Sequence, residues 1–208
     1  MEKIDIPKRT VYRLPLYQRC LQKFIEQGVD TVSSDDLAGA AGVKSPQLRK
    51  DLGYLGQFGT RGLGYGVATL SEAISGVMGL SILQPVVLIG IGNLGAALLR
   101  YAGFRKEGFE IIAAFDAEPS NVKSTTGQMG VPVYNVADLK NYVNEHAVRV
   151  AIIAVPETAG QEVADSLVES GVQAILNFSP AVLNVPDGVE VNHVDLAVEL
   201  GSLGFFVN

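Results

Sequence analysis

A glycine-rich turn that follows an apolar run is the feature that most constrains the fold of this 208-residue chain. The turn is Gly90-Ile91-Gly92-Asn93-Leu94-Gly95, and the apolar run before it covers residues 85–89. A second apolar run, residues 109–115, is followed at once by Asp116, which lies 21 residues beyond the last glycine. A strand, a glycine turn, a helix and a strand that ends at a carboxylate form the βαβ unit typical of dinucleotide-binding sites.

The residue types in this turn fit the chemistry of a dinucleotide. Gly90 permits the tight turn, Gly92 lets the backbone approach a pyrophosphate, and Gly95 lets the helix pack closely against the strand. Unpaired N–H groups at the start of the helix can bind the phosphates. Asp116 would accept hydrogen bonds from both ribose hydroxyls and repel a 2′-phosphate, which favours NAD(H) over NADP(H). The alternative is an incidental glycine turn in an ordinary βαβ unit. The candidate cofactor-binding residues here are Gly90, Ile91, Gly92, Asn93, Leu94, Gly95 and Asp116.

Beyond residue 84, strand-like and helix-like segments alternate, which is typical of an α/β fold with a parallel sheet. Strands are predicted at residues 86–89, 110–115, 131–134, 149–155, 174–178 and 189–194. Helices are predicted at residues 94–101, 137–145 and 159–170. Ligands of such sheets lie outside the carboxyl ends of the strands. Pro156, Asn177 and Phe178 lie at such ends, so we expect them to line the nicotinamide half of the site.

Residues suited to catalysis are scarce in this chain. His146 lies in a polar segment at a helix end. His193 and Asp195 share one face of a predicted strand, but no nucleophile is evident near them. The dinucleotide unit takes up nearly everything after residue 84, which leaves no second domain to form a substrate pocket. We therefore predict no catalytic or metal-binding residues. The alternatives are a dehydrogenase with a helical appendage and a CoA-binding module, and Asp116 favours NAD over CoA.

Charge is divided unevenly along the chain. The net charge is −6, but residues 1–80 contain ten Lys or Arg and eight Asp or Glu, a net of +2. Residues 81–208 contain the other six basic and fourteen acidic residues, a net of −8. A mildly basic N-terminal part joined to an acidic remainder indicates two domains with different partners.

Cysteine content and hydropathy indicate the compartment. The single cysteine, Cys20, falls in register with the apolar face of the first predicted helix, so core packing is its expected role. One cysteine excludes an internal disulfide, which fits a reducing cytoplasm. The first residues lack the apolar segment of a signal peptide, and no apolar run reaches the ~18 residues that span a membrane. We therefore predict a cytoplasmic protein that has no membrane partner.

The first eighty residues predict a helix-turn-helix. A first amphipathic helix contains Leu14, Tyr17, Leu21 and Phe24 at helical spacing and ends at Gly28. The polar sequence at residues 33–36 caps a second helix through residue 41, and a glycine turn follows. The Ser-Pro pair at residues 45 and 46 then opens a third helix that extends to about residue 54, with serine as its cap. A glycine between two short helices is characteristic of this DNA-binding motif.

The third helix and the segment after it carry the candidate DNA contacts. Leu48 and Leu52 form the apolar stripe of the helix, which leaves Gln47, Arg49, Lys50, Asp51 and Tyr54 for the other faces. Gln and Arg can bind base edges, and Lys can bind phosphates. The glycine-dense residues 56–66 predict a β-hairpin wing with Arg61 at its tip. The alternative is a small helical docking domain with a solvated charged face. The candidate DNA-binding residues are Ser45, Gln47, Arg49, Lys50, Arg61 and Tyr65.

Motifs in both parts of the chain resemble the Rex family of redox-sensing transcriptional repressors. They lie at residues 47–52, 58–65, 90–95, 177–180 and 192–196, and the resemblance covers residues 15–206. It implies a winged-helix DNA-binding domain at residues 1–80 and a Rossmann NAD(H)-binding domain at residues 81–195. A helix at residues 196–208 would be swapped between the protomers of a homodimer. The chain ends two residues after Phe206, which leaves the extent of that helix open.

The resemblance also implies how such a chain acts. The homodimer would bind a palindromic operator when NADH is scarce and leave it when NADH binds, so that it responds to the NADH/NAD⁺ ratio without catalysing a reaction. Arg19, Tyr101 and Asp195 would form a polar network that depends on the state of the dimer. A helix at residues 67–84 is predicted to connect the two domains.

Overall fold

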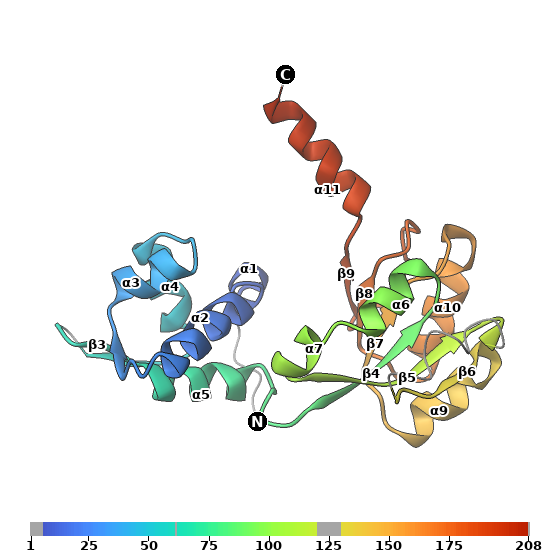
Figure 1. Cartoon of the computed structure of the whole chain (residues 1–208), viewed down its shortest axis with the longest axis horizontal. Helices are drawn as coiled ribbons and strands as arrows, with labels where there is room; N and C mark the ends of the chain where they lie inside the picture. Colours follow the sequence, from blue (N-terminus) through green and yellow to red (C-terminus); the bar gives the residue numbers. More distant parts are fainter. Residues whose placement is uncertain (1–5, 61, 120–129, 208) are drawn as a thin grey trace. The chain divides into compact units, whose positions relative to one another are not determined.

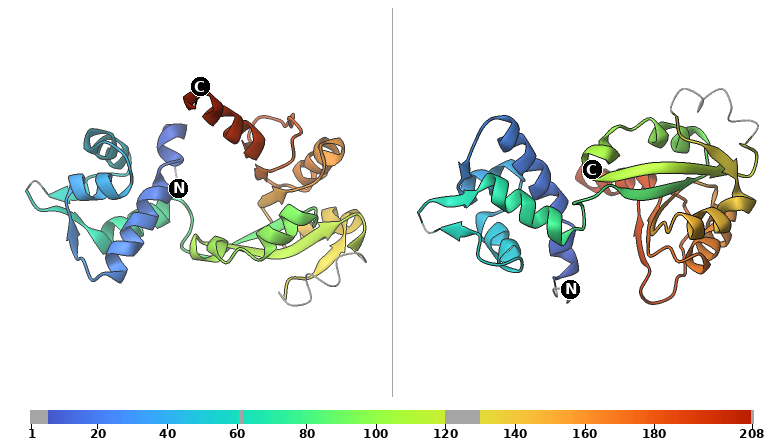
Figure 2. Two further views of the ribbon diagram at one scale, coloured as in Figure 1. Left: turned by 45° about the horizontal axis from the view of Figure 1, so that its top comes forward. Right: turned by 90° about the horizontal axis from the view of Figure 1, so that it is seen from below.

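The computed structural model describes residues 6–60, 62–119 and 130–207. The chain divides into two compact units, Met1–Ile82 and Leu83–Asn208 (Figures 1 and 2). The N-terminal unit has one hydrophobic core, and the second unit has a core cluster on each face of its sheet. No helix in the described part of the chain has the length and apolar character needed to cross a membrane.

The N-terminal unit combines helices with a small antiparallel sheet. Its helices are α1 (Lys8–Val11), α2 (Leu14–Glu26), α3 (Ser34–Ala40), α4 (Ser45–Gly53) and α5 (Val67–Val77). Its strands are β1 (Thr31–Val32), β2 (Gly59–Thr60) and β3 (Gly64–Gly66), in the order β1-β3-β2. The short helix α1 has no counterpart in the sequence prediction, because four residues are too few to show a hydrophobic period.

Buried side chains and caps explain the helices of this unit. Tyr17 and Leu21 of α2 are fully buried, and Cys20 between them is buried as expected. The Ser33 side chain caps α3 by accepting the N–H of Asp36 at 3.0 Å. The prediction that Ser45 caps α4 is wrong. The cap position belongs to Lys44, and Ser45 is the first helical residue.

The predicted hairpin is present. Strands β2 and β3 pair antiparallel with Gly59 opposite Tyr65. Gly64 adopts a φ of +88°, and a Cβ there would collide with the backbone carbonyl of Val32 in β1, so glycine is required. The Tyr65 ring is buried in the core of the unit, beneath the hairpin. Arg61, the predicted tip residue, lies outside the described residues.

The second unit contains a six-stranded parallel sheet. Its strands are β4 (Gln84–Ile89), β5 (Phe109–Asp116), β6 (Val133–Asn135), β7 (Val150–Ile153), β8 (Ala174–Asn177) and β9 (Glu190–His193). Their order in the sheet is β6-β5-β4-β7-β8-β9, so the chain moves outward from β4 first to one side and then to the other. All six predicted strands are confirmed. The helix predicted at residues 67–84 is too long, because α5 ends at Val77 and Gln84 already belongs to β4.

Helices cover both faces of this sheet. They are α6 (Asn93–Leu99), α7 (Gly103–Lys106), the 3₁₀ turn η2 (Val136–Asp138), α9 (Leu139–Glu145) and α10 (Glu157–Glu169). Leu139 of α9 and Leu167 of α10 belong to the core cluster on one face, and Ala96 of α6 belongs to the cluster on the other. The reversal of strand order beside β4 creates a switch point, where parallel sheets bind their ligands.

The chain ends in α11 (Leu196–Leu203) and the 3₁₀ turn η3 (Gly204–Phe206). Asp195 caps α11, since its carboxylate accepts the N–H groups of Ala197 and Val198 at 2.9 and 3.1 Å. The apolar side chains of this segment are exposed, including Leu200 at 70% and Phe206 at 79%. An apolar helix with exposed side chains is the usual sign of a surface that a partner covers.

Candidate cofactor site and nucleic-acid interface

The glycine turn lies at the carboxyl end of β4, between β5 and β7. Gly90 has a φ of +91°, and a Cβ there would lie 2.6 Å from the carbonyl oxygen of Ala154. A Cβ at Gly95 would collide with the carbonyl oxygen of Gly90. A Cβ at Gly92 meets no atom within 4 Å. The fold therefore requires glycine at two of the three positions, and the third faces open space.

Asp116, at the end of β5, contacts the glycine turn directly. Its Oδ2 accepts the backbone N–H of Ile91 at 2.7 Å, and its Oδ1 accepts the N–H of Glu118 at 3.0 Å. The residue is half-buried. An ionised carboxylate offers about four lone-pair sites, so two remain for further donors such as hydroxyl groups. The carboxylate that the sequence analysis singled out thus lies beside the turn and retains acceptor capacity.

The other predicted cofactor residues differ in what they can contribute. Asn93 and Leu94 are exposed at the start of α6, and Pro156 is exposed just before α10. The Ile91 side chain is only 7% exposed and packs into the core, so its contribution is limited to its backbone. Phe178 is half-buried after β8 and packs against the same core cluster.

Asn177 is fully buried at the end of β8, and its side chain is occupied by local contacts. Its Nδ2 donates to the carbonyl oxygens of Ser179 and Ala181, and its Oδ1 accepts the N–H of Ser179. Nδ2 also lies 3.0 Å from Nδ1 of His193. Asn177 therefore shapes the loop that follows β8. Its side-chain amide is used by these contacts and does not line the site, contrary to the expectation from the sequence.

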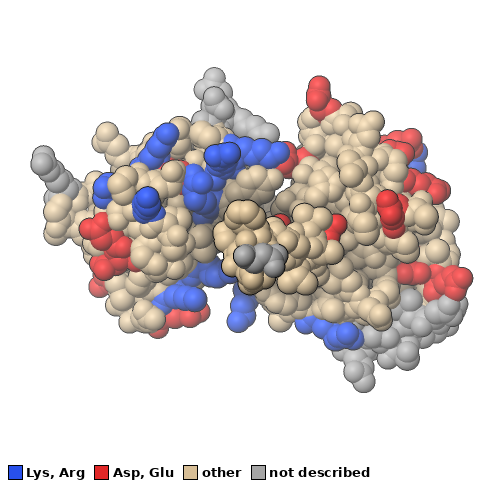
Figure 3. Space-filling model, turned by 90° about the horizontal axis from the view of Figure 1, so that it is seen from above, with Lys and Arg blue, Asp and Glu red and all other residues tan. Residues whose placement is uncertain are grey.

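In the N-terminal unit, α4 presents basic side chains to solvent. Arg49 and Lys50 are exposed, and one guanidinium nitrogen of Arg49 donates to Oγ of Ser34 at 3.0 Å. Ser45 and Gln47 are half-buried. On the face of the molecule that Figure 3 shows, Lys and Arg side chains are frequent over the N-terminal unit, and Asp and Glu side chains are frequent over the second unit. This distribution agrees with the uneven charge of the sequence.

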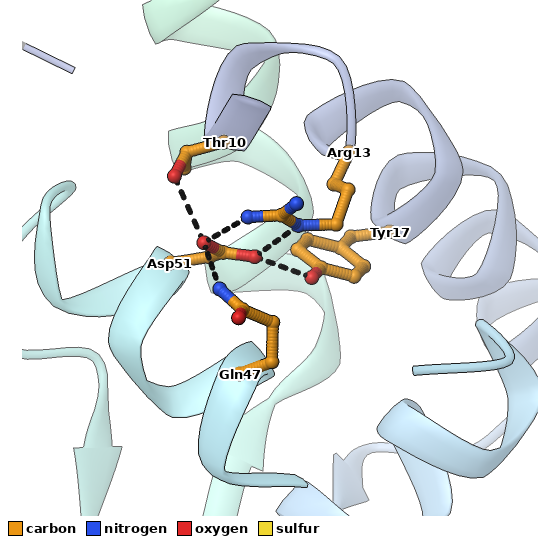
Figure 4. A network of polar contacts seen from close by, with 5 residues as sticks. All are labelled: Thr10, Arg13, Tyr17, Gln47 and Asp51. Atoms are coloured by element: carbon orange, nitrogen blue, oxygen red, sulfur yellow. Dashed lines mark hydrogen bonds and ion pairs between the residues drawn. The ribbon is translucent and has the colours of Figure 1, made fainter. Parts of the chain in front are cut away.

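A buried carboxylate lies behind the exposed face of α4 (Figure 4). The Asp51 side chain is 0% exposed. Its Oδ1 accepts hydrogen bonds from Thr10 at 2.8 Å, Arg13 Nη2 at 2.7 Å and Gln47 Nε2 at 2.9 Å. Its Oδ2 accepts hydrogen bonds from Arg13 Nε at 2.6 Å and the Tyr17 hydroxyl at 2.7 Å. Five hydrogen bonds therefore compensate for the burial of this charge.

The sequence pattern leaves Asp51 for a face other than the apolar stripe, but the structure buries it together with Leu48 and Leu52. A signal for its true position exists in the sequence, because Asp51 lies three residues after Leu48 and directly before Leu52, on the buried face of the helix. The hydrogen-bond donors could not be predicted, since Thr10 belongs to the short helix α1 and Arg13 to the junction between α1 and α2.

These contacts fix the charge of the network. Burial alone would raise the pKa of Asp51, but hydrogen bonds, above all from Arg13, outweigh burial and lower this pKa to about 2. The hydrogen bond to Asp51 raises the pKa of Arg13, and burial followed by the nearby carboxylate raises the pKa of Tyr17. Arg13 is therefore cationic, Asp51 anionic and Tyr17 protonated at every pH near neutrality.

Models of known protein families match parts of both units of the chain. Residues 5–53 match the family model of a putative DNA-binding protein N-terminus, and residues 83–181 match the model of a CoA binding domain. The redox-sensing transcriptional repressor Rex of Streptomyces coelicolor is 50% identical over 200 residues, which cover 96% of this chain and 77% of that protein. The chain belongs to the Rex family of redox-sensing transcriptional repressors.

Two solved structures of Rex-like fold match almost the whole chain. One, RSP in complex with β-NAD⁺ and operator DNA, has a TM-score of 0.87 and 32% identity, and the match covers 98% of this chain and 93% of that one. The other, RSP in complex with β-NADH, has a TM-score of 0.83 and 30% identity, with coverage of 98% and 95%. Because Rex proteins are repressors and not enzymes, the dehydrogenase alternative is rejected.

The three residues expected to form the Rex polar network lie on different elements. Arg19 is exposed on α2 of the N-terminal unit. Tyr101 follows α6, is 60% exposed, and packs edge-on against Phe104 with ring centroids 5.0 Å apart. Asp195 caps α11. Each of the three side chains lies on a different element of the chain. The network that they are expected to form together is part of the proposed dimer.

Proposed function

We propose that this Rex-family chain represses transcription as a homodimer that binds a palindromic operator and is released from it by NADH. The observation that carries the proposal is the pairing, on one chain, of a basic helix-turn-helix unit with a glycine turn that contacts Asp116. It is supported by the RSP structures, one with β-NAD⁺ and operator DNA and one with β-NADH. The functional parts are residues 1–80, 81–195 and 196–208, and they act in the cytoplasm.

The cofactor is held at the carboxyl ends of β4, β5, β7 and β8. The open surface at Gly92 admits a pyrophosphate, the two free acceptor sites of Asp116 take the ribose hydroxyls, and Phe178 contributes apolar surface at the nicotinamide end. When bound, the cofactor supplies a nicotinamide ring that is neutral in NADH and cationic in NAD⁺. An apolar pocket disfavours the cation, so the site prefers NADH. The same carboxylate favours NAD(H) over CoA. The proposed cofactor residues are Gly90, Ile91, Gly92, Asn93, Leu94, Gly95, Asp116, Pro156 and Phe178, with Asn177 in support.

Operator DNA is bound by α4 in the major groove and by the β2–β3 hairpin. The exposed Arg49 and Lys50 contact bases and phosphates, Gln47 contacts a base edge, and Ser45 at the start of the helix contacts the backbone. Arg61, which lies outside the described residues, is proposed from the sequence to contact a minor groove or a phosphate. Tyr65 is removed from the set of direct contacts, because its ring is buried and supports the hairpin from within.

The homodimer is formed in part by α11 and η3, swapped between protomers. Their exposed apolar side chains, among them Leu200, Phe205 and Phe206, gain burial only against another surface. In the dimer, Arg19, Tyr101 and Asp195 form the network that changes between the two states. Asp195 is already fixed by its cap on α11, so any movement of this helix moves its carboxylate.

The dimer explains how a cofactor can control DNA binding. Two recognition helices must meet half-sites separated by about 34–36 Å or a multiple of that spacing. A closure around NADH that changes this separation prevents simultaneous docking. The cofactor shifts the equilibrium only by its differential affinity for the two states, and a full inversion requires roughly 10⁴-fold.

A combined cofactor and DNA assay tests the proposal. The purified chain is expected to carry NAD(H), identified by mass spectrometry after denaturation, and to shift promoter DNA of its organism in a gel. Addition of NADH should reverse the shift. Recovery of CoA in place of NAD(H), or a shift that does not respond to NADH, would contradict the proposal.

A further inference from the structure

Besides the buried Leu48 and Leu52, Asp51 links the recognition helix α4 to the rest of its unit. Oδ2 of this buried carboxylate is held by Arg13 and Tyr17, and Oδ1 is held by Thr10 and the second Arg13 nitrogen. These donors come from α1, α2 and the junction between them. The carboxylate is therefore fixed in place before any DNA arrives.

Gln47, one turn before Asp51 on α4, completes this set of contacts from the helix itself. Its Nε2 donates to Oδ1 of Asp51 at 2.9 Å, and Figure 4 shows its Oε1 directed away from the carboxylate. The orientation of the amide follows from chemistry, because an ionised carboxylate only accepts and the amide nitrogen must face it. One N–H of Gln47 is used in this contact, and among the residues that the structure describes neither Oε1 nor the second N–H has a hydrogen-bond partner.

An amide with one acceptor and one donor free matches one base edge in the major groove. Adenine presents the N6 amino donor beside the N7 acceptor, and glutamine binds this pair through both groups of its amide. Because Gln47 is half-buried and hydrogen-bonded, its side chain has less rotational freedom to lose on binding than that of an unrestrained glutamine.

We propose that Asp51 is a positioning residue that holds Gln47 so that its free amide groups read an adenine in each operator half-site. This inference rests on the proposed function, since it requires α4 to enter the major groove. Asp51 itself touches no base. It acts through Gln47, and it sets base preference at one position without adding to the general affinity for DNA.

The test measures base discrimination by the full-length chain without added NADH. An operator is first selected from random duplex DNA, and fluorescence anisotropy at fixed salt then gives affinities for that operator. The same assay is applied to a series of operators, in each of which one adenine of the half-site is replaced. It is also applied to a scrambled duplex of equal length. The variants are Asp51→Ala, Gln47→Met and the double variant. Tyr17→Phe is the matched control, because Tyr17 donates to Oδ2 and Gln47 to Oδ1.

The unaltered chain should prefer the selected operator about tenfold or more over the duplex with one particular adenine replaced. Asp51→Ala and Gln47→Met should each reduce this preference to within about twofold at that same base pair, with unchanged affinity for scrambled DNA. The double variant should lose no more base preference than Gln47→Met alone, because both substitutions remove the same contact between Gln47 and Asp51. Tyr17→Phe should keep the preference.

Three results would overturn the inference. The first is that Asp51→Ala keeps the full preference for the selected operator. The second is that Asp51→Ala weakens binding equally to every duplex, including the scrambled one. The third is that the losses of preference in the two single variants add up in the double variant. Failure of the unaltered chain to select any sequence would instead reject the proposed function. If Asp51→Ala fails to fold, side-chain ¹⁵N relaxation of Gln47 in the unaltered protein without DNA tests whether the Gln47 side chain is held in place. An ordered Nε2 group is expected, and a freely rotating one would contradict the positioning role.

Discussion

The ion pair between Arg13 and Asp51 makes the stability of the N-terminal unit depend on pH in a defined direction. The pKa of Asp51 is about 2 in the folded chain and has the ordinary value of 3.8 when the chain unfolds. A carboxylate whose pKa is lower in the folded state stabilises that state above its unfolded pKa. It loses this contribution as the pH falls through the folded value. The stabilisation is therefore complete above about pH 5 and mostly lost by pH 2.

The size of the effect follows from the same two pKa values. Their difference corresponds to about 2 kcal/mol of the free energy of unfolding at neutral pH. Asp51→Asn keeps the shape of the side chain and removes its charge, so it also leaves Arg13 without its ionic partner. We expect a loss of about 3 kcal/mol at pH 7, in the range seen when one member of a buried pair is removed. About 2 kcal/mol of this difference should disappear between pH 5 and pH 2.

Native-state hydrogen exchange of the amides in α2 and α4 measures the free energy of unfolding of the N-terminal unit by itself. A separate measurement is needed because a chain of two units need not unfold in one step. Asp30→Asn, at an exposed aspartate of the same unit, is the control for the loss of one carboxylate and should leave the free energy of unfolding at pH 7 nearly unchanged. A difference between the unaltered chain and Asp51→Asn that stays constant from pH 7 to pH 2 would refute the electrostatic account of the Asp51 network.

Four further substitutions test the proposed sites. Arg49→Ala should abolish operator binding in an anisotropy assay but leave the NADH dissociation constant within about twofold, and a parallel loss of NADH binding would contradict the separation into two functional units. Gly92→Ala should keep the melting temperature, because a Cβ there meets no atom of the described residues within 4 Å, and it should weaken NADH binding by blocking the pyrophosphate. Gly95→Ala should lower the melting temperature, because its Cβ collides with the carbonyl oxygen of Gly90. Equal melting temperatures of Gly92→Ala and Gly95→Ala would be inconsistent with the structure. Leu200→Glu should shift the chain from dimer to monomer in analytical ultracentrifugation, and an unchanged dimer would exclude α11 from the interface.

The parallel sheet was predictable because its inner strands, such as β4 and β7, are largely buried. Residues 150–155 are continuously apolar, as a strand buried on both faces requires, and the structure places β7 within that range. The glycine turn was predictable for a related reason, since Gly90 and Gly95 sit where any Cβ would collide with backbone. Both signals depend on the type of residue and its spacing along the chain, which a single sequence displays directly.

Contacts between residues distant in sequence were harder to foresee. The hydrogen bonds that accompany the burial of Asp51 could not be predicted from its own helix, because its partners Thr10 and Arg13 lie about forty residues away in the sequence. Asn177 illustrates the same difficulty. Its position at the end of β8 was predicted, but only the path of the following loop shows that its amide is used internally.

Operator binding as a function of cofactor redox state tests the central claim most directly. Anisotropy of a labelled operator is measured at fixed salt while NADH and NAD⁺ are varied separately over the same concentrations. NADH should release the DNA at concentrations where NAD⁺ leaves the complex intact, because the two cofactors differ in the charge of the nicotinamide ring. Release by both cofactors at equal concentrations would contradict the account of this chain as a redox sensor.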